Sequence, residues 1–580
     1  MQGASEKGPE TLIERPGLAR LERYAGLLLA AITILVWGIP LVGAVDFSYD
    51  DKEAIASNPV VTGALPAAEA FNRDYWHHLE DAGHYRPLAT LLLRHDHERA
   101  GGPVPATFRW TNVLLHALIV GLLAAAWRRL SIRHGLPFPW FGLAVLAVHP
   151  SCADVVAWIS GRTSLVSGLG AAAGMFGLAV MKRGPTILAV CLLASLVSLL
   201  GKEDGVVVAA ALPLSAAALR PVDRMTRARR AVWAGAGSLC ALGIYAGLRT
   251  YALGAALPSS PSAPLANVDL VDRVWIGLGA WTHGFIEFVC FWNPAPPSLP
   301  ASAFECPDPL VQGLLVAVLL LAAVLTFSRG EPAKVALLGL GCVLLCIAPL
   351  VQIVPAGEIF APRFLYQPMI FGVFLLQWLI GACRPALGKL SPWVQCGLIA
   401  GMYTVSILQA APRYTDRLAY WESHLAFEAE DSRIWVAVGQ ARQEKGDSEG
   451  AMETYTRSIR LDPGIAAPWS KIGELRERDG HLEGAADAFR EAIARDPEAV
   501  IARANLGSVL LRLDRPAQAL TAYEEAIARS PGLAALHRGA ARALWRLGRI
   551  DAAHDAVLET IRLDPSDDAA RRLLRRIEGR

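Results

Sequence analysis

The sequence predicts an all-α protein made of a polytopic membrane domain followed by an α-solenoid. Three observations lead to this prediction. Up to about residue 412 the 580-residue chain is a string of charge-poor apolar runs, most of them long enough to cross a bilayer. The charged residues crowd instead into the final third of the chain. In that third, small residues and Asp-Pro dipeptides recur every 34 residues, a period typical of stacked helical pairs.

About eleven of the apolar runs are predicted to be transmembrane helices. They are Tyr24–Val45, Trp110–Trp127, Leu136–Ala153, Thr163–Met181, Gly184–Gly201, Gly205–Leu219, Ala231–Leu248, Pro309–Ser328, Val335–Gly357, Phe364–Cys383 and Leu390–Pro412. A twelfth run, Val271–Trp292, carries acidic and basic residues, and we interpret it as interfacial. Counting it as a span would move two basic loops to the exterior, against the positive-inside rule.

This count predicts the sidedness of the chain. Residues 1–23 form a cytoplasmic tail, and residues 24–412 form the membrane domain with an exterior loop at 46–109. Everything after residue 412 then lies on the exterior face. Because the composition is rich in Ala, Arg and Leu, we expect a bacterial inner membrane with periplasmic repeats, although a chain in the endoplasmic reticulum would have the same pattern.

The C-terminal third has the pattern of tetratricopeptide repeats. Small residues stand where two helices would cross closely, an aromatic residue follows in most repeats, and Pro ends each second helix. The recurring positions are Gly439, Gly473, Gly507 and Ala541, then Tyr455, Phe489, Tyr523 and Val557, then Pro463, Pro497, Pro531 and Pro565. We predict a linker helix at 413–431, four repeats at 432–567 and a capping helix at 568–580.

An acidic pair, Asp50 and Asp51, opens the exterior loop directly after the first apolar run. Carboxylates at the edge of a bilayer are costly and are seldom structural. A carboxylate there can act as a general base on an acceptor hydroxyl. The alternative is that one of the two caps a short helix that begins at this point.

Four cations mark the predicted exterior ends of the spans, and we interpret them as a phosphate site: Arg86, Arg162, Lys202 and Arg363. A lipid-linked sugar phosphate is an anion, and Arg and Lys are the side chains that bind phosphate. The alternative is that each cation pairs with a nearby acid or extends to lipid headgroups. Further residues predicted to line the same cavity are His149, Asp154, Glu203, Glu358 and Tyr366.

The first helices of the predicted repeats line an inner groove that becomes basic along the array. Its predicted residues are Arg433, Gln440, Ser470, Glu474, Ser508, Arg538 and Arg542. Such a groove could hold an extended acceptor polypeptide near the membrane site. It could equally hold a partner protein of the envelope.

The motifs YDDKEAIASNP, YRPL, TNVLLHAL, HPSCADVVAWISGRTSL, GKEDG and APRFLY occur in this order, ahead of the repeats. In this order the sequence resembles the transmembrane, tetratricopeptide-containing O-mannosyltransferases and their bacterial relatives, which are GT-C glycosyltransferases. The motifs are weak singly and specific as a set. One departure is Pro362, where the family usually has Glu before the Arg of its last motif; Glu358 is the candidate to replace it.

The resemblance implies an inverting transfer of a sugar from a polyprenyl-phosphate donor to a hydroxyl on the exterior face. By that likeness Asp50 is the general base and Asp51 supports it. Mannose as the sugar comes from the resemblance alone, and Ser or Thr of an exported protein is the favoured acceptor because of the repeats. Phosphate leaves already ionised, so one base and a cluster of cations suffice for the chemistry.

The remaining expectations concern cofactors and competing functions. We expect no cofactor beyond the lipid-linked substrate, no metal site and no nucleic-acid partner, because the sequence lacks zinc-like Cys spacing and basic-aromatic interleaving. Whether the transfer requires a metal stays open. Cys290 and Cys306 flank a Pro-rich loop and could pair in an oxidising compartment. The alternative function is a non-catalytic membrane scaffold whose repeats assemble an envelope complex.

Overall fold

The computed structural model describes the chain in segments. They are residues 16–41, 47, 51–75, 83–134, 136–218, 224–255, 268–274, 276–277, 279–280, 331–347, 362–383, 394, 397, 401, 404, 416–425 and 429–579. These segments hold helices and turns but no strand, which confirms the all-α prediction. The chain divides into two compact units, Met1–Tyr420 and Trp421–Arg580.

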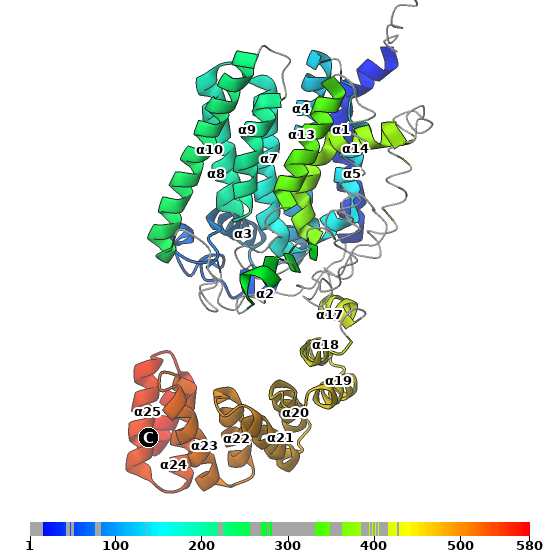
Figure 1. Cartoon of the computed structure of the whole chain (residues 1–580). Helices are drawn as coiled ribbons and strands as arrows, with labels where there is room; N and C mark the ends of the chain where they lie inside the picture. The colour runs from blue at the N-terminus through cyan, green and yellow to red at the C-terminus, as the bar shows by residue number, and fades with distance from the viewer. Residues whose placement is uncertain are drawn as a thin grey trace, which may run out of the picture. The chain divides into compact units, whose positions relative to one another are not determined.

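The first unit is a bundle of long apolar helices (Figure 1). Its main elements are α1 (Pro16–Leu41), α3 (Pro87–Ala100), α4 (Pro105–His134), α5 (Trp140–Val148), α7 (Arg162–Val180), α8 (Gly184–Gly201), α9 (Gly205–Ala218), α10 (Arg224–Leu253), α13 (Glu331–Ile347) and α14 (Tyr366–Cys383). α7 packs between α4 and α8, α10 covers α8 and α9, and α14 lies against α5 and α13.

Five helices of the described segments are long and apolar enough to cross a membrane. They cover Glu22–Ile39, Pro105–Arg133, Ile159–Val180, Gly184–Gly201 and Met225–Leu253. Shorter apolar helices occupy Gly205–Ala217 and Val335–Cys346. The runs at 309–328 and 390–412 lie wholly or largely outside the described residues. These helices support the prediction of a membrane protein. The count of eleven spans stays a prediction.

The run at 136–153 differs from its prediction as a single span. Its helix α5 has nine residues, about 14 Å at 1.5 Å per residue, against about 30 Å of hydrocarbon. Pro139 precedes the helix and Pro150 follows it, and proline is poorly tolerated inside a helix. The chain continues through η2 (Pro150–Cys152), α6 (Ala153–Val156) and η3 (Ile159–Gly161), all buried.

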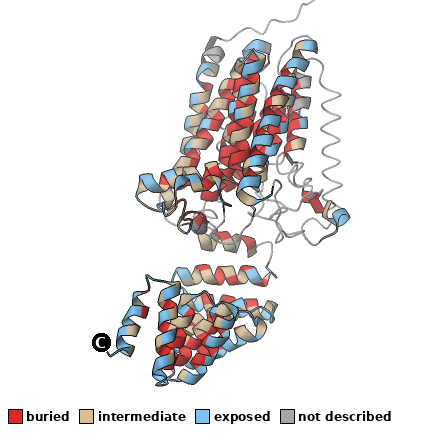
Figure 2. Ribbon diagram, turned by 90° about the vertical axis from the view of Figure 1, so that its left-hand side faces the viewer, coloured by how far each residue is buried: buried red, intermediate tan, exposed pale blue. Residues whose placement is uncertain are grey.

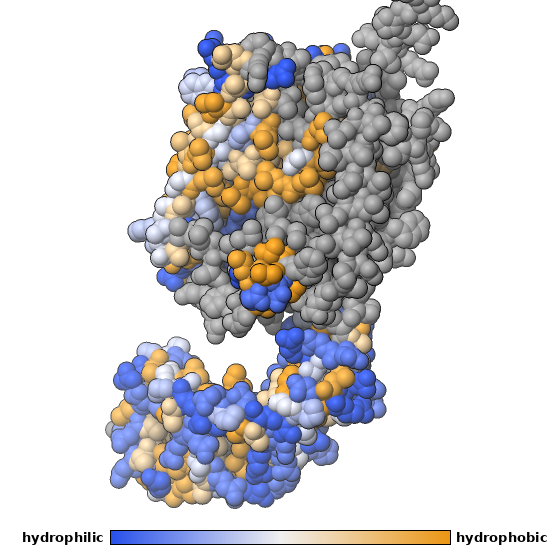
Figure 3. Space-filling model, in the orientation of Figure 1, coloured by the Kyte–Doolittle hydropathy of each residue, from blue (hydrophilic) through white to orange (hydrophobic). Residues whose placement is uncertain are grey.

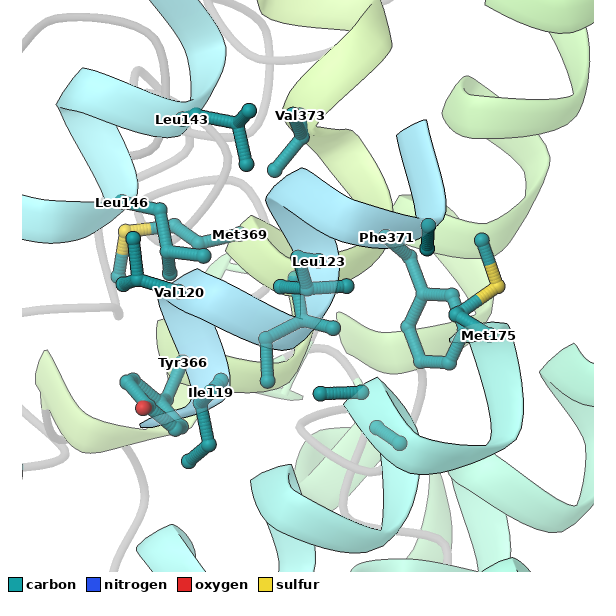
Figure 4. Packing of buried hydrophobic residues seen from close by; sticks show 14 of the residues in the cluster. Ile119, Val120, Leu123, Leu143, Leu146, Met175, Tyr366, Met369, Phe371 and Val373 are labelled. Atoms are coloured by element: carbon teal, nitrogen blue, oxygen red, sulfur yellow. The ribbon is translucent and has the colours of Figure 1, made fainter. Parts of the chain in front are cut away.

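Close packing of α4, α5, α7 and α14 forms the core of this unit (Figure 4). Glycines allow two of these approaches. A Cβ at Gly142 on α5 would lie 1.9 Å from the carbonyl oxygen of Val373 on α14, so no larger residue fits there without movement. Likewise a Cβ at Gly168 on α7 would lie 2.6 Å from the ring of Tyr366. The first turn of α14 is thereby held against α7.

Polar bonds between helices reinforce this packing. Ser198 on α8 donates to the carbonyl oxygen of Ser167 on α7 at 2.9 Å. Gln367 on α14 donates to the hydroxyl of the same Ser167 at 2.9 Å. Hydrogen bonds of this kind join helices where apolar burial alone gives no preference between protein and lipid.

The second unit consists of antiparallel helix pairs. The pairs are α18 (Ser432–Glu444) with α19 (Ser448–Leu461), α20 (Ala467–Arg478) with α21 (Leu482–Arg495), α22 (Val500–Arg512) with α23 (Pro516–Arg529), and α24 (Ala534–Arg546) with α25 (Ile550–Leu563). α17 (Arg417–Leu425) precedes them and α26 (Asp568–Ile577) follows. Buried residues line the inner side of each pair (Figure 2).

The small residues of the 34-residue pattern face its aromatic residues. A Cβ at Gly439 would lie 2.4 Å from the ring of Tyr455, and one at Gly473 would lie 2.7 Å from the ring of Phe489. Both rings are completely buried. The periodicity therefore encodes close helix crossings, which a ring fills in the first three repeats and Val557 occupies in the fourth.

Surface hydropathy separates the two units (Figure 3). Hydrophobic side chains gather across the helices of the first unit, whereas the repeats show mostly hydrophilic ones. On α10, Leu239, Ile244 and Tyr251 are exposed large residues. An apolar surface of this kind on a helical bundle is suited to contact with lipid.

Candidate functional site

Asp51 is the first residue of α2 (Asp51–Ile55) and is completely buried. Its Oδ1 accepts hydrogen bonds from the Ser160 backbone N–H at 2.9 Å and from the Ser160 hydroxyl at 3.1 Å. The carboxylate therefore joins α2 to η3, more than one hundred residues later in the chain. Asp50 lies outside the described residues.

Arg162 is enclosed by protein. Its Nη1 forms a 2.7 Å ion pair with Oδ2 of Asp96, and the exposed fraction of its side chain is zero. Nε donates to Oδ1 of Asn112 at 2.9 Å. Nη1 also donates to the carbonyl oxygen of Leu92 at 3.2 Å, and Nη2 donates to that of Phe108 at 2.6 Å. With these partners Arg162 holds α3, α4 and the start of α7 together.

The same network fixes the turn that carries Ser160. Asn112 on α4 accepts from Arg162 and donates through Nδ2 to the carbonyl oxygen of Trp158 at 3.0 Å. Asp96 is buried as well and accepts from Thr111 at 2.9 Å and from Arg99 at 3.2 Å. Arg162 thus acts on Asp51 by positioning the turn that donates to it, in addition to the attraction between their charges.

Arg86 lies beside the short loop between α8 and α9. Its Nε pairs with Oε2 of Glu203 at 3.0 Å, and the backbone N–H of Tyr85 donates to Oε1 of the same carboxylate. His84 Nδ1 lies 3.4 Å from Oε1. Burial alone would raise the pKa of Glu203, but Arg86 and His84 outweigh it and hold that pKa well below its ordinary value. Glu203 is therefore ionised and bound to a cation at neutral pH.

Lys202 precedes Glu203 in the same loop. Its Nζ donates to the Ser164 hydroxyl at 3.0 Å, pairs with Oδ2 of Asp204 at 3.1 Å and lies 5.2 Å from the centroid of the Phe364 ring. This last contact is a cation–π interaction. It brings the α8–α9 loop against η6 (Pro362–Leu365).

Arg363 stands on η6 between two aromatic rings. Its Cζ lies 4.7 Å from the centroid of the Trp158 ring and 5.6 Å from that of Phe364. Asp154 accepts both its backbone N–H at 3.1 Å and its Nη1 at 3.0 Å, through Oδ2. Because Lys202 and Arg363 face the same Phe364 ring, their charges are separated by no more than the two centroid distances combined.

Tyr366 and His116 connect η6 to the core. The Tyr366 hydroxyl lies 2.7 Å from His116 Nδ1, and His116 Nε2 lies 3.3 Å from the carbonyl oxygen of Ala147. A carbonyl only accepts, so Nε2 carries the proton and the Tyr366 hydroxyl donates to Nδ1. His149, the next predicted residue, is buried and accepts the Ser151 N–H at 3.1 Å, capping η2.

The predicted site residues therefore separate into groups. Lys202 and Arg363 lie together around Phe364. Glu203 follows Lys202 in the sequence and pairs with Arg86. Arg162 and Asp51 belong to the enclosed network. Glu358, Cys290 and Cys306 lie outside the described residues. In the described segments no group of three or more His, Cys, Asp or Glu is placed to hold a metal ion.

The predicted groove residues all stand on first helices of the repeats, on α18, α20, α22 and α24. Arg433 is strongly exposed and pairs with Asp431 at 2.7 Å, and Glu474 pairs with Lys471 at 2.9 Å. Arg538 forms an ion pair with Asp567. Arg542 is exposed, and Gln440, Ser470 and Ser508 are partly exposed.

Sequence reasoning missed several residues of this site. Asp96 belongs to the run His95-Asp96-His97-Glu98, which has the appearance of a solvated charge cluster, yet it is the buried partner of Arg162. Trp158 and Phe364 were not singled out, although each stands close to a cation in the motifs WISGR and PRFLY. An aromatic residue next to a membrane-edge Arg was the available signal.

Comparison with family models confirms the repeats. Models described as tetratricopeptide repeat match residues 432–465, 471–534 and 510–577. Together these matches cover the helix pairs described above and α26.

The curated relatives are named protein O-mannosyl-transferases, which confirms the resemblance expected from the motifs. Tmtc1 of Drosophila melanogaster is 38% identical over 128 residues, covering 21% of this chain and 14% of the relative. TMTC2 of Homo sapiens is 35% identical over 130 residues, covering 21% and 15%. Human TMTC4 is 30% identical over 164 residues, covering 25% and 22%. The chain thus spans well under a third of the length of these relatives.

Among solved structures, the matches cover about a quarter to a third of this chain. A crystal structure of MamA protein has 20% sequence identity and a TM-score of 0.24, covering 26% of this chain and 81% of that chain. YrrB, described as a tetratricopeptide-repeat protein with an unusual peptide-binding site, has 15% identity and a TM-score of 0.25, covering 33% and 96%. Likenesses of this strength do not bear on function.

Proposed function

We propose that the protein is an integral-membrane GT-C glycosyltransferase that moves a sugar from a polyprenyl-phosphate donor to a hydroxyl group. The observation that carries this proposal is the cluster of Lys202 and Arg363 around Phe364, in a chain whose curated relatives are named O-mannosyl-transferases. A non-catalytic scaffold has no need for two cations held on one ring at the end of a helical bundle.

The donor phosphate binds Lys202 and Arg363 in this proposal. Both cations keep a small exposed part, 9% and 12% of their side chains, in contrast to the completely enclosed Arg162. Each is already oriented by a carboxylate, Asp204 or Asp154, so little reorganisation precedes binding. Preorganised positive charge stabilises the phosphate as it leaves the sugar. Arg86 lies beside the same α8–α9 loop, where its charge is paired with Glu203.

Asp50 is the general base in this proposal. Asp51 supports it by anchoring the start of α2 to Ser160, a bond that fixes the backbone next to Asp50. The transfer inverts the sugar carbon, because one base on the acceptor side and a leaving phosphate on the other require no covalent intermediate. We assign no cofactor to this reaction.

The repeats recruit the acceptor. We propose that an exported polypeptide lies along the groove residues of α18, α20, α22 and α24 and delivers Ser or Thr to the membrane site, at a raised effective concentration. The proposed sugar is mannose. The proposed location is a bacterial inner membrane, with the N-terminus cytoplasmic and the repeats periplasmic.

The test is transfer by the purified full chain in detergent or liposomes, with polyprenyl-phosphate mannose and an acceptor polypeptide. Lys202→Met is compared with Lys182→Met, which removes an exposed lysine just beyond the opposite end of α7 from Arg162. We expect Lys202→Met to lose most transfer and Lys182→Met to behave as wild type. Equal activity of the two variants would remove Lys202 from the donor site. A wild type that transfers no sugar but still assembles an envelope complex would favour the scaffold.

A further inference from the structure

Arg249, near the end of α10, is a buried cation that neither motif nor pattern singles out. It is 1% exposed. Its Nη2 donates to the carbonyl oxygen of Gly83 at 2.5 Å. Its Nε and Nη1 have no hydrogen-bond partner, and no carboxylate pairs with it in the part of the chain that the structure describes.

A buried cation without these partners is energetically unfavourable. A guanidinium has five N–H donors and stays charged at any physiological pH. Burying a charge is costly unless it is paired, so natural proteins pair buried cations with anions. Arg162 shows the usual solution, with Asp96 as its anion and further hydrogen bonds to neutral oxygens. Arg249 has neutral neighbours instead, the Gly83 carbonyl that accepts from it and the nearby Tyr245 hydroxyl.

The cations near Arg249 do not share this deficit. Arg86 has Glu203 and Lys202 has Asp204, each at about 3 Å, so those charges cancel in pairs. Arg249 belongs to the same region because Gly83 precedes His84, which contacts Glu203. Tyr245, one turn earlier on α10, also contacts Tyr85 with ring centroids 5.9 Å apart. The region also contains Asp74, whose Oδ2 accepts the His84 backbone N–H at 2.6 Å. Of the three cations here, Arg86 and Lys202 are in ion pairs, whereas Arg249 has two N–H groups without a hydrogen-bond partner.

We propose that Arg249 binds a phosphate oxygen of the lipid-linked donor. The inference rests on the proposed function and adds a donor-binding residue to it. Nε and Nη1 are the free donors, and guanidinium N–H groups suit phosphate oxygens.

A purely structural role makes a different prediction. Gly83 has φ of +73°, a left-handed conformation, and the Arg249 bond to its carbonyl could serve only to hold that turn. Removing Arg249 would then destabilise the protein. If the Arg249 charge is instead unpaired in the absence of ligand, Arg249→Met removes the cost of burying that charge together with the hydrogen bond to Gly83. The melting temperature without ligand then stays level or rises.

The experiment measures the melting temperature of the purified full chain in detergent, alone, with polyprenyl phosphate, and with phosphatidylglycerol. Arg230→Met is the matched control. Arg230 is also buried and stands near the other end of α10, where it donates to the carbonyl oxygens of Met181 and Leu178. Donor and acceptor KM are measured in parallel.

We expect polyprenyl phosphate to raise the wild-type melting temperature and phosphatidylglycerol to raise it less. Arg249→Met should keep or exceed the wild-type value without ligand and bind polyprenyl phosphate about tenfold or more weakly, as loss of a charged hydrogen bond implies. Arg249→Lys should recover part of this affinity. Donor KM should rise with acceptor KM unchanged, and Arg230→Met should respond to the lipid as wild type does.

Three results would overturn the inference. First, Arg249→Met could destabilise the protein as much as Arg230→Met does and still respond to the lipid as wild type does. Arg249 would then have a structural role only, and the proposed function would stand. Second, both lipids could raise the melting temperature equally, with both effects lost in Arg249→Met. Arg249 would then belong to a general binding site for phospholipid headgroups. A wild type that neither responds to polyprenyl phosphate nor transfers sugar removes the proposed function, and the Arg249 assignment with it.

Discussion

Replacing Arg162 by Met should be among the most damaging single changes in the first unit. The change leaves Asp96 buried with the cation at 2.7 Å removed, and it strips the Nη2 donor from the carbonyl oxygen of Phe108. Breaking a buried ion pair on one side costs roughly 3–5 kcal/mol. Arg99 still contacts Asp96 at 3.2 Å, so we expect the lower end of that range.

The assay is a double-mutant cycle with Asp96→Asn, measured by thermal unfolding of the purified full chain. Because the two residues are in direct contact, their effects should not add. We expect a coupling energy of about 1–3 kcal/mol, with the double variant less unstable than the sum of the single variants. Additive effects would show that Arg162 and Asp96 do not form the pair described here.

The same variants test how Arg162 acts on the reaction. Arg162 contacts Asn112, which holds the turn that presents Ser160 to Asp51. A positioning role predicts that Arg162→Met lowers kcat with little change in donor KM. A large rise in donor KM with normal stability would instead make Arg162 a direct phosphate ligand, as the sequence suggested.

Three further predictions follow from single contacts. Glu203→Gln should lower the melting temperature at pH 7. Because the folded pKa of Glu203 lies below its ordinary 4.5, the ion pair stabilises the protein fully above pH 4.5, and this stabilisation is lost as pH falls through the folded pKa. The difference in melting temperature between wild type and variant should therefore shrink from pH 7 to pH 3.5, and a constant difference would contradict this. Tyr366→Phe leaves His116 Nδ1 without its donor and should cost about 1–3 kcal/mol; an unchanged thermal melt would exclude the bond. Gly473→Leu places atoms where the Phe489 ring lies and should destabilise the repeats by about 1–3 kcal/mol. Circular dichroism melts of the full chain measure this loss. An unchanged melting temperature would show that α20 and α21 do not cross so closely.

The repeats were predictable because their signal is local. Each 34-residue unit repeats a small position and a bulky one, aromatic in three of the four units, so the contact between Gly473 and Phe489 can be inferred from spacing alone. The apolar runs that fall within the described segments were predictable as helices for the same reason. Hydropathy averages, however, ignore proline positions, and so the run at 136–153 was predicted as one span although prolines on either side of α5 shorten it.

The site was less predictable, because its contacts join distant segments. Arg162 was predicted to bind phosphate, with a nearby acid as the alternative partner, whereas in the structure it pairs with Asp96 on α3, more than sixty residues earlier. Lys202 and Arg363 meet on Phe364, which requires the α8–α9 loop and η6 to be adjacent. One sequence specifies these contacts only through the packing of α7, α8 and α14, which no local pattern reveals.

Sugar transfer by Asp50→Asn in the reconstituted full chain tests most sharply whether Asp50 is the general base. The control is Asp487→Asn, which neutralises an exposed aspartate in the repeats. A general base contributes about 100- to 10,000-fold to rate. We expect a loss of this order in kcat for Asp50→Asn, unchanged donor KM and normal transfer by Asp487→Asn. Wild-type transfer by Asp50→Asn would contradict it.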